Sequence, residues 1–272
     1  MDSQRRGAAV CGVIGSADDM RILILGGTTE ARRLAECLAD RPRLAVTLSL
    51  AGRTATPLAH KVPVRIGGFG GVEGLADYLR GQRVEALIDA THPYAAIISD
   101  NAVRAAEAAG VPLLALRRPP WFAVAGDRWL DVADLKAAAD ALEPAPRRVF
   151  LALGRSELAA FVDAPQHHYL VRSVDPVDPP LALPHATYVT GRGPFAEAEE
   201  RTLLQTHRID VIVAKNSGGT AVYGKIAAAR HLGLAVIMVR RPALPDVAAV
   251  EAVADAVAWL DHVGVPAADR GV

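Results

Sequence analysis

The first candidate for chemistry is the turn Gly26-Gly27-Thr28-Thr29-Glu30-Ala31, which follows a short apolar run and opens a segment with helical spacing. Glycines let a backbone approach a pyrophosphate closely, and the free amides and dipole at the start of a helix favour its negative charge. The turn departs from the GxGxxG pattern, because Glu30-Ala31 stands where the third glycine belongs. A tight turn with a threonine cap is the alternative. We expect these six residues to bind a dinucleotide.

The second candidate, Ala51-Gly52-Arg53-Thr54, follows the next apolar run. Folds that bind NAD usually carry an acidic residue here, which accepts hydrogen bonds from the adenosine ribose. This chain has no acid at that place, and the guanidinium of Arg53 is suited to a 2′-phosphate. A surface arginine in a turn is the alternative. The pattern favours NADPH as the cofactor, held by Gly52, Arg53 and Thr54.

A third loop, Thr91-His92-Pro93-Tyr94, follows the buried run that ends at Asp89. Ligands of such sheets bind at the carboxyl ends of the strands. His92 is either a proton donor, with Asp89 as its only evident carboxylate partner, or one of several residues that line the cofactor site. We expect the second role for all four residues.

Cations and small residues gather at the strand ends of the C-terminal half. A cleft built from backbone amides and Lys or Arg side chains binds anions, and a substrate with several carboxylates fits it; unrelated surface charges are the alternative. Lys215 is our candidate catalytic residue. The expected substrate contacts are Arg155, Ser156, Arg192, Asn216, Ser217, Gly218, Gly219, Tyr223 and Lys225.

Short apolar runs alternate with helical spacing, and this alternation must position these loops. The first half has five expected strands, at 21–25, 45–50, 62–66, 84–90 and 112–116, and the second has five, at 149–153, 169–171, 186–189, 209–214 and 235–239. Such alternation is typical of α/β folds with parallel sheets. We therefore expect two Rossmann-like lobes with an active-site cleft between them.

The expected boundaries follow from this alternation. They are an N-terminal extension at 1–19, an NADP-binding lobe at 20–118, a linker and connecting helix at 119–146, a substrate lobe at 147–262 and a tail at 263–272. The segment VEALIDATHPYA, with the helix and strand expected after it, is similar to a later segment, IDVIVAKNSGG, which is also followed by an expected helix and strand. This similarity indicates either a duplicated lobe or a chance match between two βαβ units.

The composition excludes several functions. The 30 basic and 30 acidic residues cancel, so no basic surface for nucleic acid is expected. No apolar run approaches the roughly 20 residues that cross a bilayer. Cys11 and Cys37 have no metal or redox spacing, so we expect no metal and a reducing, cytoplasmic setting.

The motifs of this chain, taken in order, resemble those of the precorrin-6A reductase family of cobalamin biosynthesis. They are ILILGGTTEARRLA, AGRT, IGGFGG, DATHPYA, LALGRSEL, VTGRGPF and VAKNSGG with YGKI. The resemblance runs from Met20 to about Pro242. It implies two Rossmann-like lobes with NADPH and a tetrapyrrole substrate between them, and reduction of the C18–C19 double bond of precorrin-6A to give precorrin-6B. It also implies transient contacts with neighbouring pathway enzymes.

Other functions stay open from the sequence. A cobalt-precorrin-6A reductase of the anaerobic route has the same chemistry on a metallated ring. A non-catalytic NADP sensor and a sugar-nucleotide or methyl-transfer enzyme use the same fold, because fold does not fix function. The proton donor is also open among Lys215, Tyr223, His92 and solvent.

Overall fold

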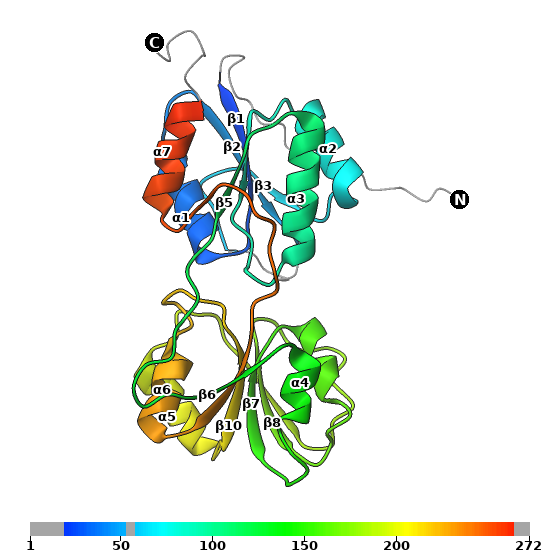
Figure 1. The fold of residues 1–272 in the computed structure, drawn as a ribbon, viewed down its shortest axis with the longest axis vertical. Coiled ribbons are helices and arrows are strands. Elements are labelled where there is room, and N and C mark those ends of the chain that lie inside the picture. The colour runs from blue at the N-terminus through cyan, green and yellow to red at the C-terminus, as the bar shows by residue number, and fades with distance from the viewer. Residues whose placement is uncertain (1–18, 53–57, 264–272) are drawn as a thin grey trace, which may run out of the picture.

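The computed structural model describes residues 19–52 and 58–263, and Figure 1 shows two lobes joined by a narrow waist. Each lobe is built on a sheet of six parallel strands. Helices cover both faces of each sheet. The expected α/β class with two Rossmann-like parallel sheets is confirmed.

The sheet of the first lobe has the strand order β12-β5-β4-β1-β2-β3. Helices α1 and α7 cover one face and helices α2 and α3 the other, so the core is almost wholly aliphatic. The elements are β1 (Met20–Leu25), α1 (Thr29–Leu38), β2 (Leu44–Leu50), β3 (Val64–Ile66), α2 (Gly71–Gly81), β4 (Ala86–Asp89), α3 (Ala96–Ala109), β5 (Leu113–Leu116), β12 (Ala249–Val250) and α7 (Val253–Val263).

The sheet of the second lobe has the order β6-β11-β10-β7-β8-β9. Here α4 and the 3₁₀ helix η1 cover one face, and α5 and α6 the other. The elements are β6 (Arg128–Val132), α4 (Leu135–Asp140), β7 (Arg148–Ala152), η1 (Arg155–Phe161), β8 (His168–Ser173), β9 (Ala186–Thr190), α5 (Glu197–Thr206), β10 (Val211–Lys215), α6 (Gly224–Leu232) and β11 (Ala235–Val239).

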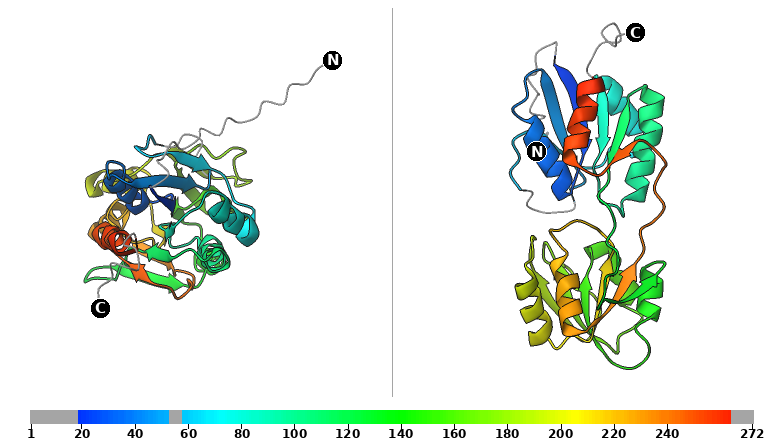
Figure 2. Two further views of the ribbon diagram at one scale, coloured as in Figure 1. Left: turned by 90° about the horizontal axis from the view of Figure 1, so that it is seen from above. Right: turned by 60° about the vertical axis from the view of Figure 1, so that its left-hand side comes forward.

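The two lobes exchange their edge strands. After β5 the chain leaves the first lobe and forms β6 beside β11, and after β11 it returns to form β12 beside β5. Our expected boundaries at 119–146 and 147–262 are therefore wrong in two places. β6 and α4 belong to the second lobe, and α7 packs on α1 in the first, where Ala256 and Leu260 are buried. The right panel of Figure 2 shows α7 beside the strands of the first lobe.

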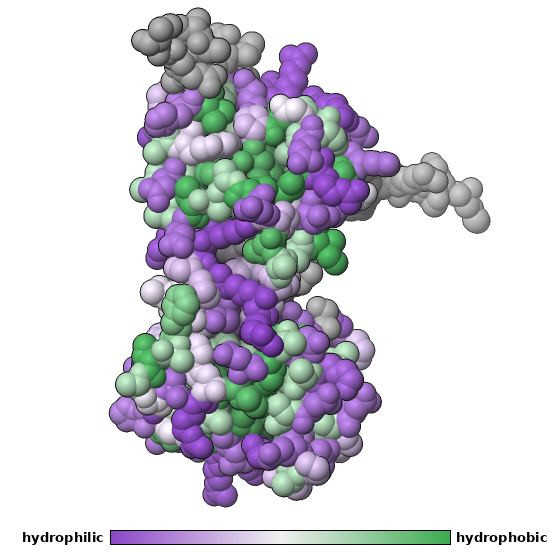
Figure 3. Space-filling model, viewed as in Figure 1, coloured by the Kyte–Doolittle hydropathy of each residue, from purple (hydrophilic) through white to green (hydrophobic). Residues whose placement is uncertain are grey.

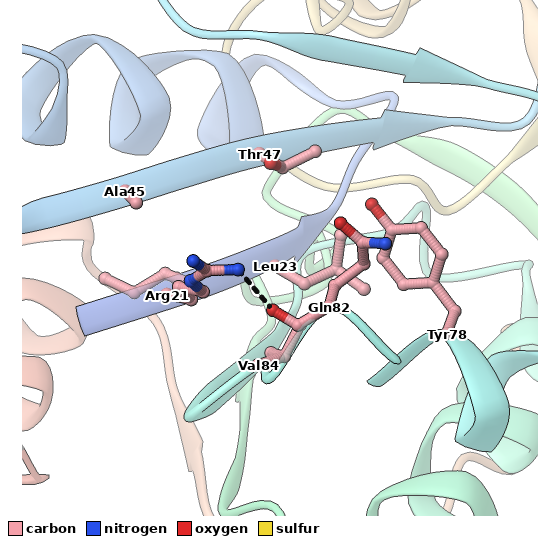
Figure 4. Close-up of a pocket in the computed structure, with 8 residues that line it drawn as sticks. Arg21, Leu23, Ala45, Thr47, Tyr78, Gln82 and Val84 are labelled. Carbon is pink, nitrogen blue, oxygen red and sulfur yellow. Dashed lines mark hydrogen bonds between the residues drawn. The ribbon is translucent and has the colours of Figure 1, made fainter. Parts of the chain in front are cut away.

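Local contacts repeat between the lobes as well. In the first lobe the guanidinium of Arg21 donates to the carbonyl oxygen of Gln82 at 3.1 Å (Figure 4), and its backbone N–H donates to the carboxylate three residues beyond Gln82. Arg148 makes the same two bonds, to the carbonyl oxygen of His207 and to the carboxylate three residues beyond it. With the shared strand order, this match supports the duplicated lobe over the chance match.

The cavity beside Arg21 in Figure 4 measures only about 30 Å³, which is room for little more than a water molecule. It lies at the amino ends of β1 and β2, on the side of the sheet away from the second lobe. It is therefore not the ligand site that the sequence predicts. None of the helices in the described ranges combines the length and the apolar character that a membrane crossing requires.

Candidate active site

A cavity of about 1180 Å³ lies between the lobes. Its walls come from the residues that follow β1, β2 and β4 on one side and β7, β8, β9 and β10 on the other, so the carboxyl edges of both sheets face it. Figure 3 shows hydrophilic side chains gathered at this waist, where the surface is hollowed. Such a volume exceeds that of a typical single-ligand pocket, about 300–1000 Å³. The cleft therefore has room for two ligands side by side.

The turn after β1 forms part of the first-lobe wall. Gly27 has a φ of +113°, and a Cβ added there would meet nothing within 4 Å, so its backbone is open to a ligand. Thr28 caps α1, because its hydroxyl accepts from the N–H of Ala31 at 3.1 Å and donates to the carbonyl of Ala90 at 2.8 Å. Thr28 therefore caps α1 while the backbone of Gly27 stays open to a ligand, so the capping role does not exclude ligand binding at this turn.

Two members of the expected phosphate turn lie elsewhere. A Cβ on Gly26 would stand 2.6 Å from Leu48, so this glycine allows the turn to pack on β2. Ala31 is buried in the core of the first lobe. Of the six predicted residues, Gly27, Thr28, Thr29 and Glu30 line the cavity.

The loop after β2 contributes Gly52 to the wall, whereas Arg53 and Thr54 lie outside the described residues. Our sequence reasoning missed Arg33, an exposed side chain on α1 that also lines the cavity. Within the described ranges Arg33 makes no hydrogen bond or ion pair, while its neighbour Arg32 is paired with Glu36 at 2.7 Å. The spacing of apolar residues in a sequence predicts the buried face of a helix, but it does not predict that an exposed residue such as Arg33 lines a cavity.

The loop after β4 is organised around the carboxylate of Asp89. The buried carboxylate of Asp89 accepts hydrogen bonds from Thr91, through its hydroxyl at 2.7 Å and its N–H, and from the hydroxyl of Ser99 at 2.6 Å. Asp89 therefore holds the loop and is occupied by Thr91 and Ser99. His92 lines the cavity, and its Nδ1 accepts from the N–H of Tyr94 at 3.3 Å, which leaves the proton of a neutral ring on Nε2.

Tyr94 joins the lobes instead of lining the cavity. Its hydroxyl donates to the carbonyl of Val239 and accepts from the N–H of Asn216 at 2.7 Å, and burial raises its pKa to about 12. The amide of Asn216 in turn holds the backbone of Trp121, accepting from its N–H at 2.7 Å and donating to its carbonyl at 2.8 Å. We therefore revise the expected ligand contacts of Tyr94 and Asn216 to roles in the lobe junction. Thr91 and the buried Pro93 also lie outside the cavity wall.

The second-lobe wall carries several of the predicted substrate contacts. Arg155, Ser217, Gly218, Gly219 and Lys225 line the cavity, together with the candidate catalytic Lys215. The ammonium group of Lys215 is held at 2.6 Å from the carboxylate of Glu157 and lies 4.9 Å from the ring centroid of Tyr94.

Two other predicted contacts lie outside the cavity wall, and a third has a side chain that is not described. Arg192 is exposed and lies outside the cavity wall. Tyr223 is also outside it, because its hydroxyl accepts from Arg230 and its ring packs on Trp121. Ser156 lies in the first turn of η1, and its side chain is not described.

Arg118 also lines the cavity, and it lies in the first of the two linkers between the lobes, the segment between β5 and β6; the second linker is the segment between β11 and β12. Arg118 donates to the carboxylate of Glu30 at 2.8 Å and to the carbonyl of Ser217 at 2.6 Å, so it bridges the two lobes inside the cleft. The signal for it was present in the sequence, because both linkers begin with Arg-Arg-Pro, at 117–119 and 240–242. The second arginine of the other copy, Arg241, donates to the carbonyls of Asn216, Arg118 and Pro119.

The described residues hold no cluster of His, Cys, Asp and Glu side chains suited to a metal ion. The walls instead combine an open glycine turn at a helix start on one lobe with cationic and small residues on the other. This arrangement suits two ligands that meet between the lobes, a phosphate-bearing one and an anionic one.

Comparison with known proteins shows the family of the chain. Residues 21–261 match the family model described as precorrin-6x reductase CbiJ/CobK. The chain is 55% identical to a precorrin-6A reductase of Sinorhizobium sp. over 91% of its length and 95% of the relative's. It is 53% identical to one from Rhodobacter capsulatus, over 93% and 99%, and 32% identical to a cobalt-precorrin-6A reductase of Salmonella typhimurium, over 81% and 87%. A solved structure of CobK precorrin-6A reductase superposes with a TM-score of 0.87 at 51% identity, and the match covers 93% of this chain and all of the other.

Proposed function

Because the chain belongs to the precorrin-6x reductase family, we propose that its interlobe cleft binds reduced nicotinamide dinucleotide on the first lobe and precorrin-6A on the second. The protein is an oxidoreductase of cobalamin biosynthesis that reduces a double bond of precorrin-6A to give precorrin-6B. The observation that carries the assignment of the two walls is their contrast. The first lobe offers an open glycine turn at a helix start, and the second offers Arg155, Lys215 and Lys225.

The residues of the first lobe fit a dinucleotide. Gly27 leaves space for a pyrophosphate, and the N–H groups at the start of α1 point toward the cavity end of β1. Gly52 lines the cavity without a side chain, which leaves room for the adenosine half of the dinucleotide. When bound, the reduced nicotinamide supplies a hydride, and the chemistry of that transfer belongs to the cofactor. The protein's part is to orient both ligands and to exclude water.

We propose that the cofactor is NADPH, with Arg33 and Arg53 as the contacts to its 2′-phosphate. Arg33 has no partner among the described residues and lines the same cavity as Gly52, which precedes Arg53 in the chain. A guanidinium that pairs with a phosphate contributes about 1.5–3 kcal/mol. Arg33→Ala should therefore raise the Kd for NADPH by about 10- to 100-fold and leave the Kd for NADH nearly unchanged.

Fluorescence titration with both cofactors measures this difference. Arg32→Ala is the matched control, since Arg32 is the neighbouring arginine and pairs with Glu36. An equal loss of affinity for NADPH and NADH in Arg33→Ala would remove the 2′-phosphate role from Arg33.

We propose metal-free precorrin-6A as the substrate, in preference to its cobalt complex. The relatives named precorrin-6A reductase reach 55% and 53% identity, while the cobalt-precorrin-6A reductases of Salmonella typhimurium and Priestia megaterium reach 32% and 29%. Turnover with both substrates at equal concentration tests the choice. Faster reduction of the cobalt complex would contradict it. A cytoplasmic setting and transient contacts with neighbouring pathway enzymes stay predictions.

The cations of the cleft support a substrate with many carboxylates. Arg172 on β8 lines the cavity, is almost fully buried, forms a two-pronged ion pair with Glu200 and lies over the ring of Phe195 at 3.7 Å. Arg155 lines the cavity without a hydrogen bond or ion pair to any described residue. We propose that Arg155, Lys215 and Ser217 contact the carboxylates, and that Arg172 shapes this wall.

A further inference from the structure

Lys225 is buried in the wall of the cavity. It lies in the first turn of α6, lines the interlobe cavity and is only 4% exposed. Its ammonium group donates to the carbonyl of Val222 at 2.7 Å and lies 5.2 Å from the ring centroid of Trp121. No carboxylate among the described residues forms an ion pair with it, whereas buried lysines are ordinarily paired.

The surroundings of Lys225 oppose its positive charge. A helix start disfavours cations because of its dipole, and Lys225 stands in the first turn of α6. Burial lowers its pKa to about 7, and Arg172, Arg118 and Lys215 act in the same direction, while Glu200 acts against it. The carboxylate of Glu200 is itself taken up by Arg172. An amine in this place gains and loses a proton near neutral pH.

A purely structural role accounts poorly for this side chain. A methionine would fill the same space on α6 without a charge to bury, and one hydrogen bond to a carbonyl contributes only about 1 kcal/mol. Burial of a charged or easily charged amine costs more than that. Side chains with such strained protonation states are typical of sites where a proton is transferred.

On the function proposed above, we infer that Lys225 is the proton donor that completes the reduction of the tetrapyrrole. A bound reduced nicotinamide would supply a hydride to one carbon of the macrocycle double bond, and the Nζ of Lys225 gives a proton to the adjacent carbon. The substrate gains two electrons and two hydrogens, the dinucleotide would be the species oxidised, and the neutral amine of Lys225 takes a new proton from solvent. Substrate carboxylates beside Lys225 favour its charged form, so the donor is loaded as the substrate binds.

Lys215, our earlier candidate for this step, fits it less well. Its ammonium group is already held by Glu157 at 2.6 Å. Lys225 also lines the cavity, but no carboxylate in the described ranges forms an ion pair with it. Burial lowers its pKa to about 7, so it can give up a proton near neutral pH.

The test compares Lys225→Arg, Lys225→Met and the control Lys136→Met in single-turnover oxidation of NADPH by precorrin-6A. Lys136 is an exposed lysine on α4, paired with Asp140 and outside the cavity wall. Arginine keeps the charge but does not release a proton near neutral pH. Loss of a general acid typically costs about 10²- to 10⁴-fold in rate. Both Lys225 variants should lose at least about 100-fold, with the Kd for NADPH within about twofold of the wild type. Lys136→Met should match the wild type.

Two further measurements separate the proton from the charge. The wild-type rate should fall as the pH rises above the pKa of Lys225 in the complex, and the residual rate of Lys225→Arg should lack this limb. In the apoprotein, ¹⁵N-lysine NMR should show one Nζ that titrates near pH 7 and is absent from Lys225→Met.

The contradictory outcomes are distinct. If the wild type reduces precorrin-6A and Lys225→Arg keeps the full rate, Lys225 is an anion contact only and this inference is wrong. The absence of any lysine that titrates below about pH 9 would also overturn it. A wild-type chain that leaves precorrin-6A unreduced contradicts the proposed function itself, and the role of Lys225 falls with it.

Discussion

At the scale of single residues, the cleft separates side chains that hold the protein together from side chains that face a ligand. Thr91, Tyr94 and Asn216 look from the sequence like ligand contacts, because they follow strands at the edge where ligands bind. Each is occupied within the protein, by Asp89, Val239 and Trp121 respectively. Sequence position therefore predicted the right edge of the sheet. It did not predict which side chains turn inward, because that depends on partners more than 100 residues away for Tyr94 and about 95 away for Asn216.

Lys225 gives a prediction about stability and pH. Its pKa is about 7 in the folded protein and near 10.5 in the unfolded chain, so between these values the unfolded chain binds more protons at this site. The free energy of unfolding therefore rises with pH across this window. Lys225→Met should be more stable than the wild type, on the order of a few kcal/mol at pH 6.5, and the difference should shrink toward pH 10.

Urea unfolding of the apoprotein at several pH values measures this trend. Lys136→Met is the control, because the neighbouring Asp140 raises the pKa of Lys136, so this side chain stays charged in the folded and the unfolded protein up to the alkaline end of the window. Its difference from the wild type should stay constant with pH. If the difference in the free energy of unfolding between Lys225→Met and the wild type were also constant with pH, Lys225 would not be a buried amine with a lowered pKa.

At the scale of elements, the loop after β10 must pass close to both linkers. A Cβ on Gly218 would stand 2.1 Å from the carbonyl oxygen of Pro119 and 2.5 Å from a guanidinium nitrogen of Arg241, and its φ is +68°. The glycines of KNSGG were read from the sequence as substrate contacts, and they do line the cavity. The need for Gly218 at the linker was not predictable, because it comes from chain segments that the sequence places about 100 residues before and more than 20 after.

Gly218→Ala should therefore destabilise the protein by about 2–4 kcal/mol, because the linker must shift and the positive φ is strained. Thermal unfolding measures the loss. Gly81→Ala is the matched control, since Gly81 ends α2 with nothing within 4 Å of an added Cβ and without a positive φ. That change should be neutral or stabilise slightly, by at most about 1 kcal/mol. A stable Gly218→Ala would mean that the linker contact is loose.

At the scale of the whole molecule, the exchanged edge strands make the lobes depend on each other. Five of the six strands of each sheet were predictable, because their apolar runs and helical spacing are local properties of the sequence. The sixth strands were missed. β6 is mostly exposed, β12 has two residues, and their partners β11 and β5 lie more than 100 residues away, so neither strand has a strong local pattern.

The exchange predicts that the lobes unfold together. The chain reaches β12 and α7 of the first lobe only after it has passed through the second lobe, and it reaches β6 of the second lobe only from β5 of the first, while Tyr94, Arg118 and Arg241 join the lobes at the waist. Scanning calorimetry of the apoprotein should show one transition whose calorimetric and van't Hoff enthalpies agree. Two resolved transitions would contradict this coupling.

The most direct test of the central claim is a stopped-flow experiment on the wild-type protein with metal-free precorrin-6A and NADPH deuterated at the transferred position. The claim is that the cleft brings the nicotinamide and the macrocycle together for hydride transfer. We predict that NADPH absorbance is lost at the same rate as the tetrapyrrole spectrum changes, that deuterium slows both equally, and that NADH reacts more slowly. Tight binding of NADPH with no oxidation, or oxidation without a change in the tetrapyrrole, would contradict it.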